Sequence, residues 1–283
     1  MASDYQPLLT RIAGLARDGH LGADVQSAAD AYSALPDDLT RCATFVRDYS
    51  VPTGDDEIDS ARDLFCKLIL ITYRDAKKRD LALAHDFAFA FFQDFPGAAG
   101  SALLPRWSSL ADASLAFQSV AHSGDMLLAW QQSSRLVQAA NEFLDGLFGL
   151  LIVAWRCAQG KAVNVNVLGN AYGSKIDEFS RLTGGDDGVF CLFLRIADSD
   201  LRNGIAHGTA WLDAASQKVR YLSGRQQKIE RDVDLPFFMC CAALGSHVGA
   251  AYVAALSAIA VLESSDTGHR ELLPASLVEL FDT

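Results

Sequence analysis

The stretch "FFMCCAALGSHVGAAYVAALSAIAVL", residues 237–262, decides the fold class, because it carries no charged side chain across 26 consecutive positions. A run of this length is long enough to cross a lipid bilayer as a helix. Polar and glycine positions at 245–249 interrupt its middle, however, and its flanks show no clear excess of positive charge on one side. We therefore favour a helix that is buried on most sides at the centre of a helical protein over a membrane span.

The rest of the chain predicts an all-α protein. Apolar residues recur at helical spacing through the first hundred residues and again up to about residue 160. The stretch 95–107, rich in glycine, alanine and proline, separates the two parts. We predict an N-terminal helical region (1–105) of unknown role and a C-terminal bundle of about four helices (106–283). The long pattern 53–97 fits two helices joined around the charged run 75–80.

Some segments of the second half depart from plain helical spacing. Residues 218–235, "KVRYLSGRQQKIERDVDL", alternate on both sides of Ser223-Gly224, which predicts a small β-hairpin inserted in the bundle. Residues 164–169, "NVNVLG", predict a short strand or an extended loop. Residues 188–208 predict a single helix that is apolar early and polar late.

Charge and cysteine content narrow the class of protein. The net charge of −11 argues against a general nucleic-acid coat, which needs a basic face, although it leaves room for a small basic site. The six cysteines are scattered through apolar surroundings and show no zinc-binding spacing, so we expect buried, reduced thiols. Reduced thiols, together with an N-terminus that lacks an apolar signal segment, predict a cytoplasmic protein. Because no zinc-binding spacing occurs, we expect no bound metal, and we expect no cofactor.

The segment "DLRNGIAHGTAW", residues 200–211, is the strongest candidate for function. On a regular helix Asn203 and His207 lie on one face, four residues apart. Asp198 and Arg202 have the same spacing and could pair. Arg202 and His207, by contrast, point about 140° apart, because each residue turns the helix by about 100°.

Three arrangements would bring these groups together. The long Arg202 side chain curls round, the helix loosens at Gly204 or Gly208, or a second protein surface completes the site. The alternative is that the segment forms no functional site. Arg202 is then a surface ion-pair residue. His207 is then a helix-terminal histidine whose positive charge suits the helix dipole.

The string "LRNGIAHG", late in a predicted bundle helix, resembles the R-N-x-x-x-H signature of the HEPN superfamily. The resemblance covers roughly residues 115–263 and implies a four-helix HEPN-like bundle. Many members of that superfamily are metal-independent endoribonucleases of toxin–antitoxin and phage-defence systems. They generally dimerise so that two motif helices face one cleft. Carried over by position, Arg202, Asn203 and His207 are the catalytic residues.

The chemistry that the resemblance implies is attack of an RNA 2′-hydroxyl on its neighbouring phosphodiester, which leaves a 2′,3′-cyclic phosphate. His207 would act as general acid or base, since imidazole exchanges protons near neutral pH. Arg202 would offset negative charge in the transition state. Asn203 would orient the histidine or a phosphate oxygen, and Asp198 would support the site. No metal is required.

A basic segment beside the motif predicts the RNA contacts. Residues 216–231 contain five basic side chains and one acidic side chain. They suggest phosphate contacts and, from the aromatic ring, base stacking. The predicted RNA-binding residues are Lys218, Arg220, Tyr221, Arg225 and Lys228. A solvated hairpin is the alternative.

The expected partners are RNA, a second copy of the chain that completes the site, and an antitoxin or other regulatory protein; we expect no membrane. Two other functions remain open. One is a non-catalytic HEPN-type module that binds a nucleotide or a protein and dimerises. The other is a helical interaction protein in which the motif is a coincidence.

Overall fold

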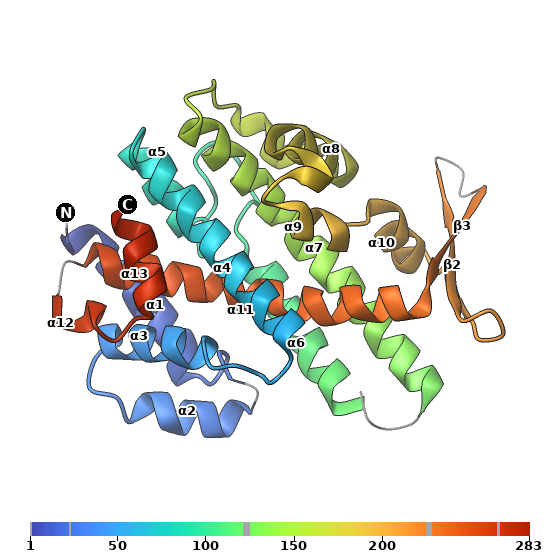
Figure 1. The fold of residues 1–283 in the computed structure, drawn as a ribbon, viewed down its shortest axis with the longest axis horizontal. Coiled ribbons are helices and arrows are strands. Elements are labelled where there is room, and N and C mark those ends of the chain that lie inside the picture. Colours follow the sequence, from blue (N-terminus) through green and yellow to red (C-terminus); the bar gives the residue numbers. More distant parts are fainter. Residues whose placement is uncertain (1, 23, 121–124, 225–227, 265–266) are drawn as a thin grey trace. The chain divides into compact units, whose positions relative to one another are not determined.

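A computed structural model describes residues 2–22, 24–120, 125–224, 228–264 and 267–283 (Figure 1). The chain is mostly helical, at 71%, and carries a small antiparallel sheet of three strands. The helical class is therefore as predicted. The sheet is more than the predicted hairpin insert, because a third strand pairs with it.

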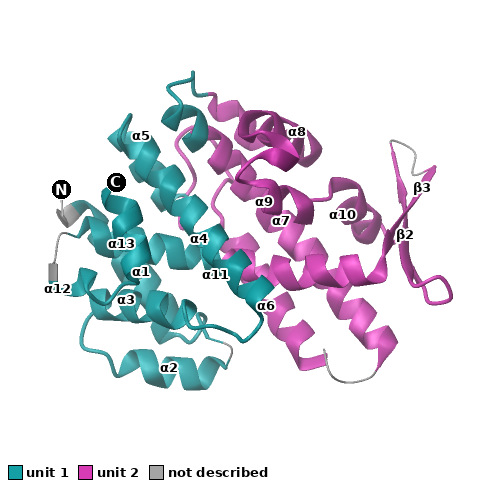
Figure 2. Ribbon diagram, viewed as in Figure 1, with its two compact units in different colours: residues 1–91, 154–163, 250–283 teal, residues 92–153, 164–249 magenta. Residues whose placement is uncertain are grey.

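The chain divides into two compact units, each of which is discontinuous in sequence (Figure 2). Unit 1 contains residues 1–91, 154–163 and 250–283, and unit 2 contains residues 92–153 and 164–249. Two long helices, α7 (Met126–Ala158) and α11 (Leu235–Glu263), begin in unit 2 and end in unit 1. The predicted boundary at residue 105 lies near residue 91, where the chain first passes from unit 1 to unit 2. The amino-acid composition gives no sign that the chain later returns to unit 1.

Unit 1 is helical, and aspartates set the starts of several of its helices. Its elements besides the ends of α7 and α11 are η1 (Ala2–Tyr5), α1 (Gln6–Arg17), α2 (Val25–Ser33), α3 (Asp38–Tyr49), α4 (Asp56–Lys77), α5 (Leu81–Phe89), α12 (Thr267–Arg270) and α13 (Ala275–Asp282). Before each of α2 to α5, an aspartate carboxylate accepts a first-turn backbone N–H, which caps the helix. The charged run 75–80 separates α4 from α5, so the two-helix interpretation of that long pattern is confirmed.

A chain of hydrogen bonds lies in unit 1 between distant parts of the sequence. The Tyr5 and Tyr73 hydroxyl oxygens are 2.5 Å apart, and Tyr73 donates to Glu263 Oε1 at 2.7 Å. Lys77 Nζ also reaches the Glu263 carboxylate, at 2.5 Å. Burial raises the pKa of Tyr5 to about 12, so its hydroxyl stays protonated well above neutral pH. These bonds tie the N-terminal helices to the end of α11.

Unit 2 holds the remaining elements. They are α6 (Leu104–Val120), η2 (Val165–Gly169), α8 (Tyr172–Thr183), η3 (Gly185–Asp187), α9 (Cys191–Ile196), α10 (Ser199–Ala206), β1 (Ala210–Asp213), β2 (Lys218–Ser223) and β3 (Ile229–Asp234), with the greater part of α7 and the start of α11. The three strands pair in the order β1-β2-β3, and β2 and β3 form the predicted hairpin.

Two local expectations in unit 2 were wrong. Residues 165–169 form a 3₁₀-helix rather than a strand or an extended loop. The single helix expected over 188–208 is broken into α9 and α10, because Ala197 is extended (φ −90°, ψ 110°) and Asp198 starts a new helix. The Asp198 carboxylate accepts the backbone N–H of Leu201, which is the capping contact that the aspartate makes at the start of α10.

Within the part of the chain that is described, two helices, α7 and α11, are long and apolar enough to cross a membrane. Their most apolar windows are 83% and 78% buried inside the protein, as in the core helices of a soluble protein.

The glycines of the uncharged stretch mark close packing in unit 2. An added Cβ would lie 2.9 Å from Ala140 at Gly245, and 2.9 Å from Leu110 at Gly249.

The cysteines are free thiols but are not all buried. Cys42, Cys66 and Cys157 are buried, whereas Cys240 is exposed. Cys191 and Cys241 are half-buried, so the expectation of six buried thiols holds for three of them and was wrong most clearly at Cys240, in the first part of α11.

Tyr73→Phe should lower the free energy of unfolding by about 1–3 kcal/mol, because it removes the buried hydroxyl that bonds to both Tyr5 and Glu263. Chemical denaturation of the full chain measures the change. The matched control is Tyr32→Phe, whose hydroxyl makes a single 3.3 Å contact with Asp48. An equal loss in both variants would show that the chain of bonds adds no stability.

Candidate functional site

The helix α10 presents the motif residues to the outside. Leu201 and Gly204 are buried on its inner side, where the helix packs against β2. Asn203 and His207 are exposed and Arg202 is half-buried. The inner positions are apolar or small and the outer positions are polar, so burial fixes which face of α10 carries the chemistry.

Arg202 is held by three contacts in unit 2. Its Nη1 donates to Asn203 Oδ1 at 3.1 Å, and its Nη2 lies 3.9 Å from Asp145 Oδ2. The guanidinium carbon lies 5.4 Å from the centre of the Tyr172 ring, within the range of a cation–π contact. These contacts hold Arg202 beside Asn203, Asp145 and Tyr172 and do not bring it to His207, so the structure does not show the predicted curl toward the histidine.

Asp145, on α7, gathers three cations. Lys175 Nζ donates to its Oδ1 at 2.8 Å, and the Lys175 side chain is only 3% exposed. Arg106 Nη1 lies 3.5 Å from Oδ2, the same oxygen that Arg202 approaches. One carboxylate is thus shared by three cations, which it neutralises only in part.

The buried amide of Asn141 positions the start of α10. Its Oδ1 accepts from the Tyr172 hydroxyl at 2.9 Å and from the Asp198 backbone N–H at 2.8 Å. Its Nδ2 donates to the carbonyl oxygens of Val137 and Ile196. All the hydrogen-bonding capacity of this amide is used, which fixes α8 and α10 against α7. Burial, together with the Asp145 carboxylate, raises the pKa of Tyr172 well above its ordinary value.

Asp198 does not pair with Arg202, contrary to the helical-spacing expectation. Its carboxylate accepts the Leu201 N–H at 2.8 Å and the Tyr221 hydroxyl at 3.1 Å. Asp198 is the N-cap residue, outside the helical turn that would set it beside Arg202. Its supporting role is therefore to start α10 and to fasten it to β2.

His207 is the residue that ends α10. Its backbone N–H bonds to the Asn203 carbonyl at 2.9 Å, and Gly208, at φ +67°, turns the chain away from the helix. The imidazole is exposed and has no side-chain hydrogen bond to any residue that the structure describes. The histidine is therefore accessible to a ligand or to another protein.

The first two predicted RNA-binding cations are engaged within the sheet. Lys218 donates to Asp232 at 2.7 Å, which raises the pKa of Lys218. Arg220 contacts Glu230 at 2.8 Å and Asp213 at 3.0 Å. The positive charge that the local sequence suggests is largely offset by carboxylates from the paired strands.

Tyr221 is not placed for base stacking, contrary to its predicted role. The residue is only 5% exposed, and its ring packs against Gly204 of the motif helix. Lys228 is exposed and has no ion-pair partner in the described part of the chain. Arg225 lies outside the described residues.

A cavity of about 290 Å³ adjoins the motif helix. Its lining residues come from α7, α10 and β1: Trp130, Gln131, Ser134, Arg135, Gln138, Ile205 and Ala210. Arg135 is exposed and makes no ion pair with any residue in the described ranges. The cavity thus combines an aromatic ring with an unneutralised cation beside α10.

Sequence reasoning missed the α7 residues of this site. Asn141 and Asp145 are polar residues four positions apart, just before the apolar run 147–155 of α7, and that spacing was the available signal. Arg135 and Asp145 lie ten positions apart, which places them about 80° apart around the helix. The partners of these residues come from other elements, so the local sequence does not reveal them.

In the described ranges, no three His, Cys, Asp or Glu side chains are grouped so that they could hold a metal ion. Comparison with protein-family models, curated proteins and solved structures finds no match to this chain.

Gly204→Ala should destabilise the protein although alanine favours helices by about 1 kcal/mol over glycine. The new Cβ would lie 2.9 Å from Tyr221 Cβ, and relieving such overpacking typically costs about 1–3 kcal/mol. Thermal unfolding measures the change. Gly14→Ala in α1 is the control, since its nearest new contact is 3.9 Å away, and it should be neutral or stabilising. A stabilised Gly204→Ala variant would contradict close packing of α10 on β2.

Proposed function

We propose that this protein is a metal-independent endoribonuclease of the HEPN type. The observation that carries the proposal is the outer face of α10, where Arg202, Asn203 and an accessible His207 occur together. A histidine bonded inside its own chain would have favoured a purely structural role. The full set of polar motif residues also favours catalysis over a module that only binds.

The proposed reaction transfers protons and needs no redox partner. A base removes the proton from the RNA 2′-hydroxyl, and the 2′-oxygen attacks the adjacent phosphorus. The bond from phosphorus to the 5′-oxygen breaks, and an acid protonates that oxygen, which leaves a 2′,3′-cyclic phosphate and a 5′-hydroxyl. His207 is the proposed acid or base. The guanidinium of Arg202 offsets charge on the phosphorane-like transition state.

A second copy of the chain is part of the proposal. One imidazole cannot act as base and acid in the same concerted step, and a two-fold arrangement of two α10 helices supplies two. Each copy exposes Asn203, Ala206 and His207 on the same side of α10, and this face of small and polar residues suits a close self-complementary approach. Arg202, already held by Asp145, would point at the shared substrate.

The RNA would run over the 290 Å³ cavity rather than along the hairpin. Arg135 offers a cation that no described carboxylate neutralises, and Trp130 offers an aromatic surface next to it. The hairpin cations Lys218 and Arg220 are paired across strands. The strongly acidic chain favours a limited RNA contact at such a site.

The cellular setting belongs to the same proposal. A cytoplasmic toxin or phage-defence effector with this activity would need an antitoxin or another regulatory partner. A non-catalytic module that binds a nucleotide or a protein is the alternative, and it predicts binding without cleavage.

RNA should be cleaved by the wild type in excess EDTA, and His207→Ala should slow cleavage by about 100-fold or more. Arg202→Ala should slow it by a similar factor, because it removes charge stabilisation. The products are analysed for 2′,3′-cyclic phosphate ends, and His20→Ala, which removes an exposed histidine of unit 1, is the control. RNA binding without cleavage would favour the binding module, and cleavage by both motif variants would exclude the assigned roles.

Arg135→Ala should weaken RNA binding by about three- to tenfold and leave the rate of bound RNA cleavage unchanged. Loss of one phosphate contact should also lower the salt dependence of binding by about one unit of slope. Fluorescence anisotropy at several salt concentrations measures both quantities. Arg17→Ala, which removes an exposed arginine of unit 1, is the control, and equal effects of the two variants would argue against an RNA path at the cavity.

A further inference from the structure

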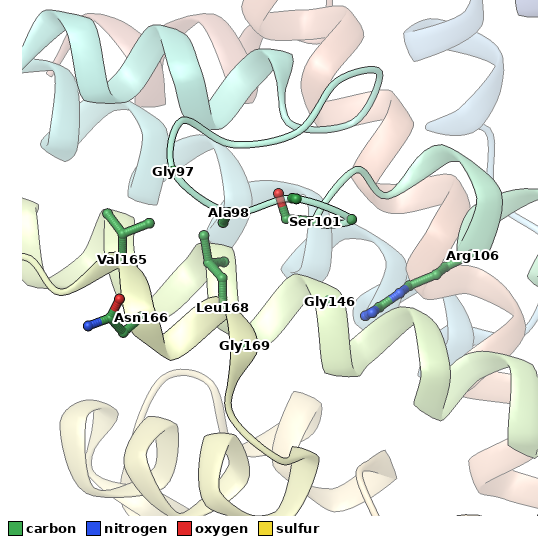
Figure 3. A pocket seen from close by; sticks show the side chains of 11 residues that line it. Gly97, Ala98, Ser101, Arg106, Gly146, Val165, Asn166, Leu168 and Gly169 are labelled. Atoms are coloured by element: carbon green, nitrogen blue, oxygen red, sulfur yellow. The ribbon is translucent and has the colours of Figure 1, made fainter.

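A second cavity lies in unit 2, apart from the motif residues in sequence. Its volume is about 210 Å³ (Figure 3). Its walls come from the loop 97–101, from Arg106 on α6, from Gly146 on α7 and from residues of η2. The cavity is smaller than the 300–1,000 Å³ of typical drug-sized sites, so its occupant must be small or must insert a single group.

The walls combine bare backbone with one cation. Gly97, Gly100, Gly146 and Gly169 line the cavity, so peptide groups are exposed to it without side chains in front of them. Arg106 is the only ionisable side chain among the lining residues. The side-chain amide of Asn166 also lines the cavity and has no hydrogen-bond partner in the described part of the chain, which makes it an available donor.

Gly146 lets the guanidinium lie where it does. An added Cβ at this position would be 2.6 Å from Arg106 Nη1 and 2.5 Å from Leu103 Cδ2. Arg106 therefore rests directly on the backbone of α7, and Figure 3 shows the side chain extending from α6 toward Gly146. Its Nη1 is 3.3 Å from the Glu142 carbonyl oxygen.

Arg106 is only partly neutralised. Its nearest carboxylate oxygen, Asp145 Oδ2, lies 3.5 Å away and is also approached by Arg202, while Lys175 binds the other oxygen at 2.8 Å. Glu142 lies one turn earlier on α7, and its carboxylate accepts from the Gln138 amide. Counting Glu142 as well, three cations face two carboxylates, so the wall keeps a positive charge.

We propose that this cavity binds a small oxyanion, a phosphate or carboxylate group of a small molecule, through the guanidinium of Arg106. A guanidinium donates two parallel hydrogen bonds to such a group, and Asn166 and the loop backbone complete the surroundings. The anion competes with Asp145 for Arg106. When it binds, Asp145 Oδ2 is left to Arg202, so occupancy of the cavity strengthens the contact that holds the motif arginine. This link is reciprocal, as any binding coupling must be.

Isothermal titration of the full-length protein with inorganic phosphate, adenosine monophosphate or succinate tests the proposal, with chloride at equal ionic strength as the reference. Phosphate and the nucleotide binding at one site per chain identify a phosphate group, whereas succinate alone identifies a carboxylate. Arg106→Ala should weaken binding at least tenfold, and Arg106→Lys, which keeps the charge but loses the fork, should weaken it several-fold. Arg181→Ala, which removes an exposed arginine of α8, should leave it unchanged.

Two further variants test the competition with Asp145. Asp145→Asn should tighten anion binding about three- to tenfold, because the competing carboxylate charge is gone, and a merely structural role of Arg106 gives no such gain. Arg202→Ala should weaken it about two- to fivefold, since Asp145 then pairs more closely with Arg106. The proposal is overturned if no probe binds more tightly than chloride, or if Arg106→Ala binds as the wild type does. Because no RNA is present, these results are independent of whether the protein cleaves RNA.

Discussion

The four hydrogen bonds of the Asn141 amide are the constraint on which the candidate site depends. Asn141 is 1% exposed and bonds to groups from α8, from the end of α9 and from the residue that starts α10. An unpaired amide in such a place would cost on the order of 1–3 kcal/mol for each lost partner. The elements around it are therefore fixed in one arrangement, and that arrangement ends α9 where it does and sets the direction of α10.

Asp145, one helical turn after Asn141, also links α7 to other elements, but through ion pairs rather than neutral hydrogen bonds. Asn141 holds the first residue of the α10 cap, and Asp145 reaches Arg202 within the same helix. Two positions four apart on α7 thus control both the placement of α10 and the direction of its arginine. Because Asp145 also binds the buried Lys175, its position is set by packing, and Arg202 is positioned by a group that cannot easily move.

The features that could be predicted from the sequence are those set by interactions between residues close together in the chain. The break between α4 and α5, the mostly helical class and the hairpin of β2 and β3 follow from local spacing, charge and turn residues. Local signals also mark the start of α10, since Asp198 precedes an acidic first turn, but the helical pattern predicted across 188–208 concealed it. The burial of Tyr221, the cross-strand neutralisation of Lys218 and the three cations of Asp145 depend on partners from other elements, and no local pattern encodes these.

The motif residues differ in how firmly they are held, and the difference has a physical consequence. Arg202 is tied to Asn203, Asp145 and the Tyr172 ring, whereas the His207 imidazole has no side-chain bond in the described structure. Fixing a side chain in one orientation costs conformational entropy. Folding has already ordered the Arg202 side chain, whereas the His207 side chain has still to be ordered. Whatever binds α10 must supply the rest. In the proposed dimer, a second copy facing the same exposed side would do so without substrate, so assembly would control whether the proposed site can act.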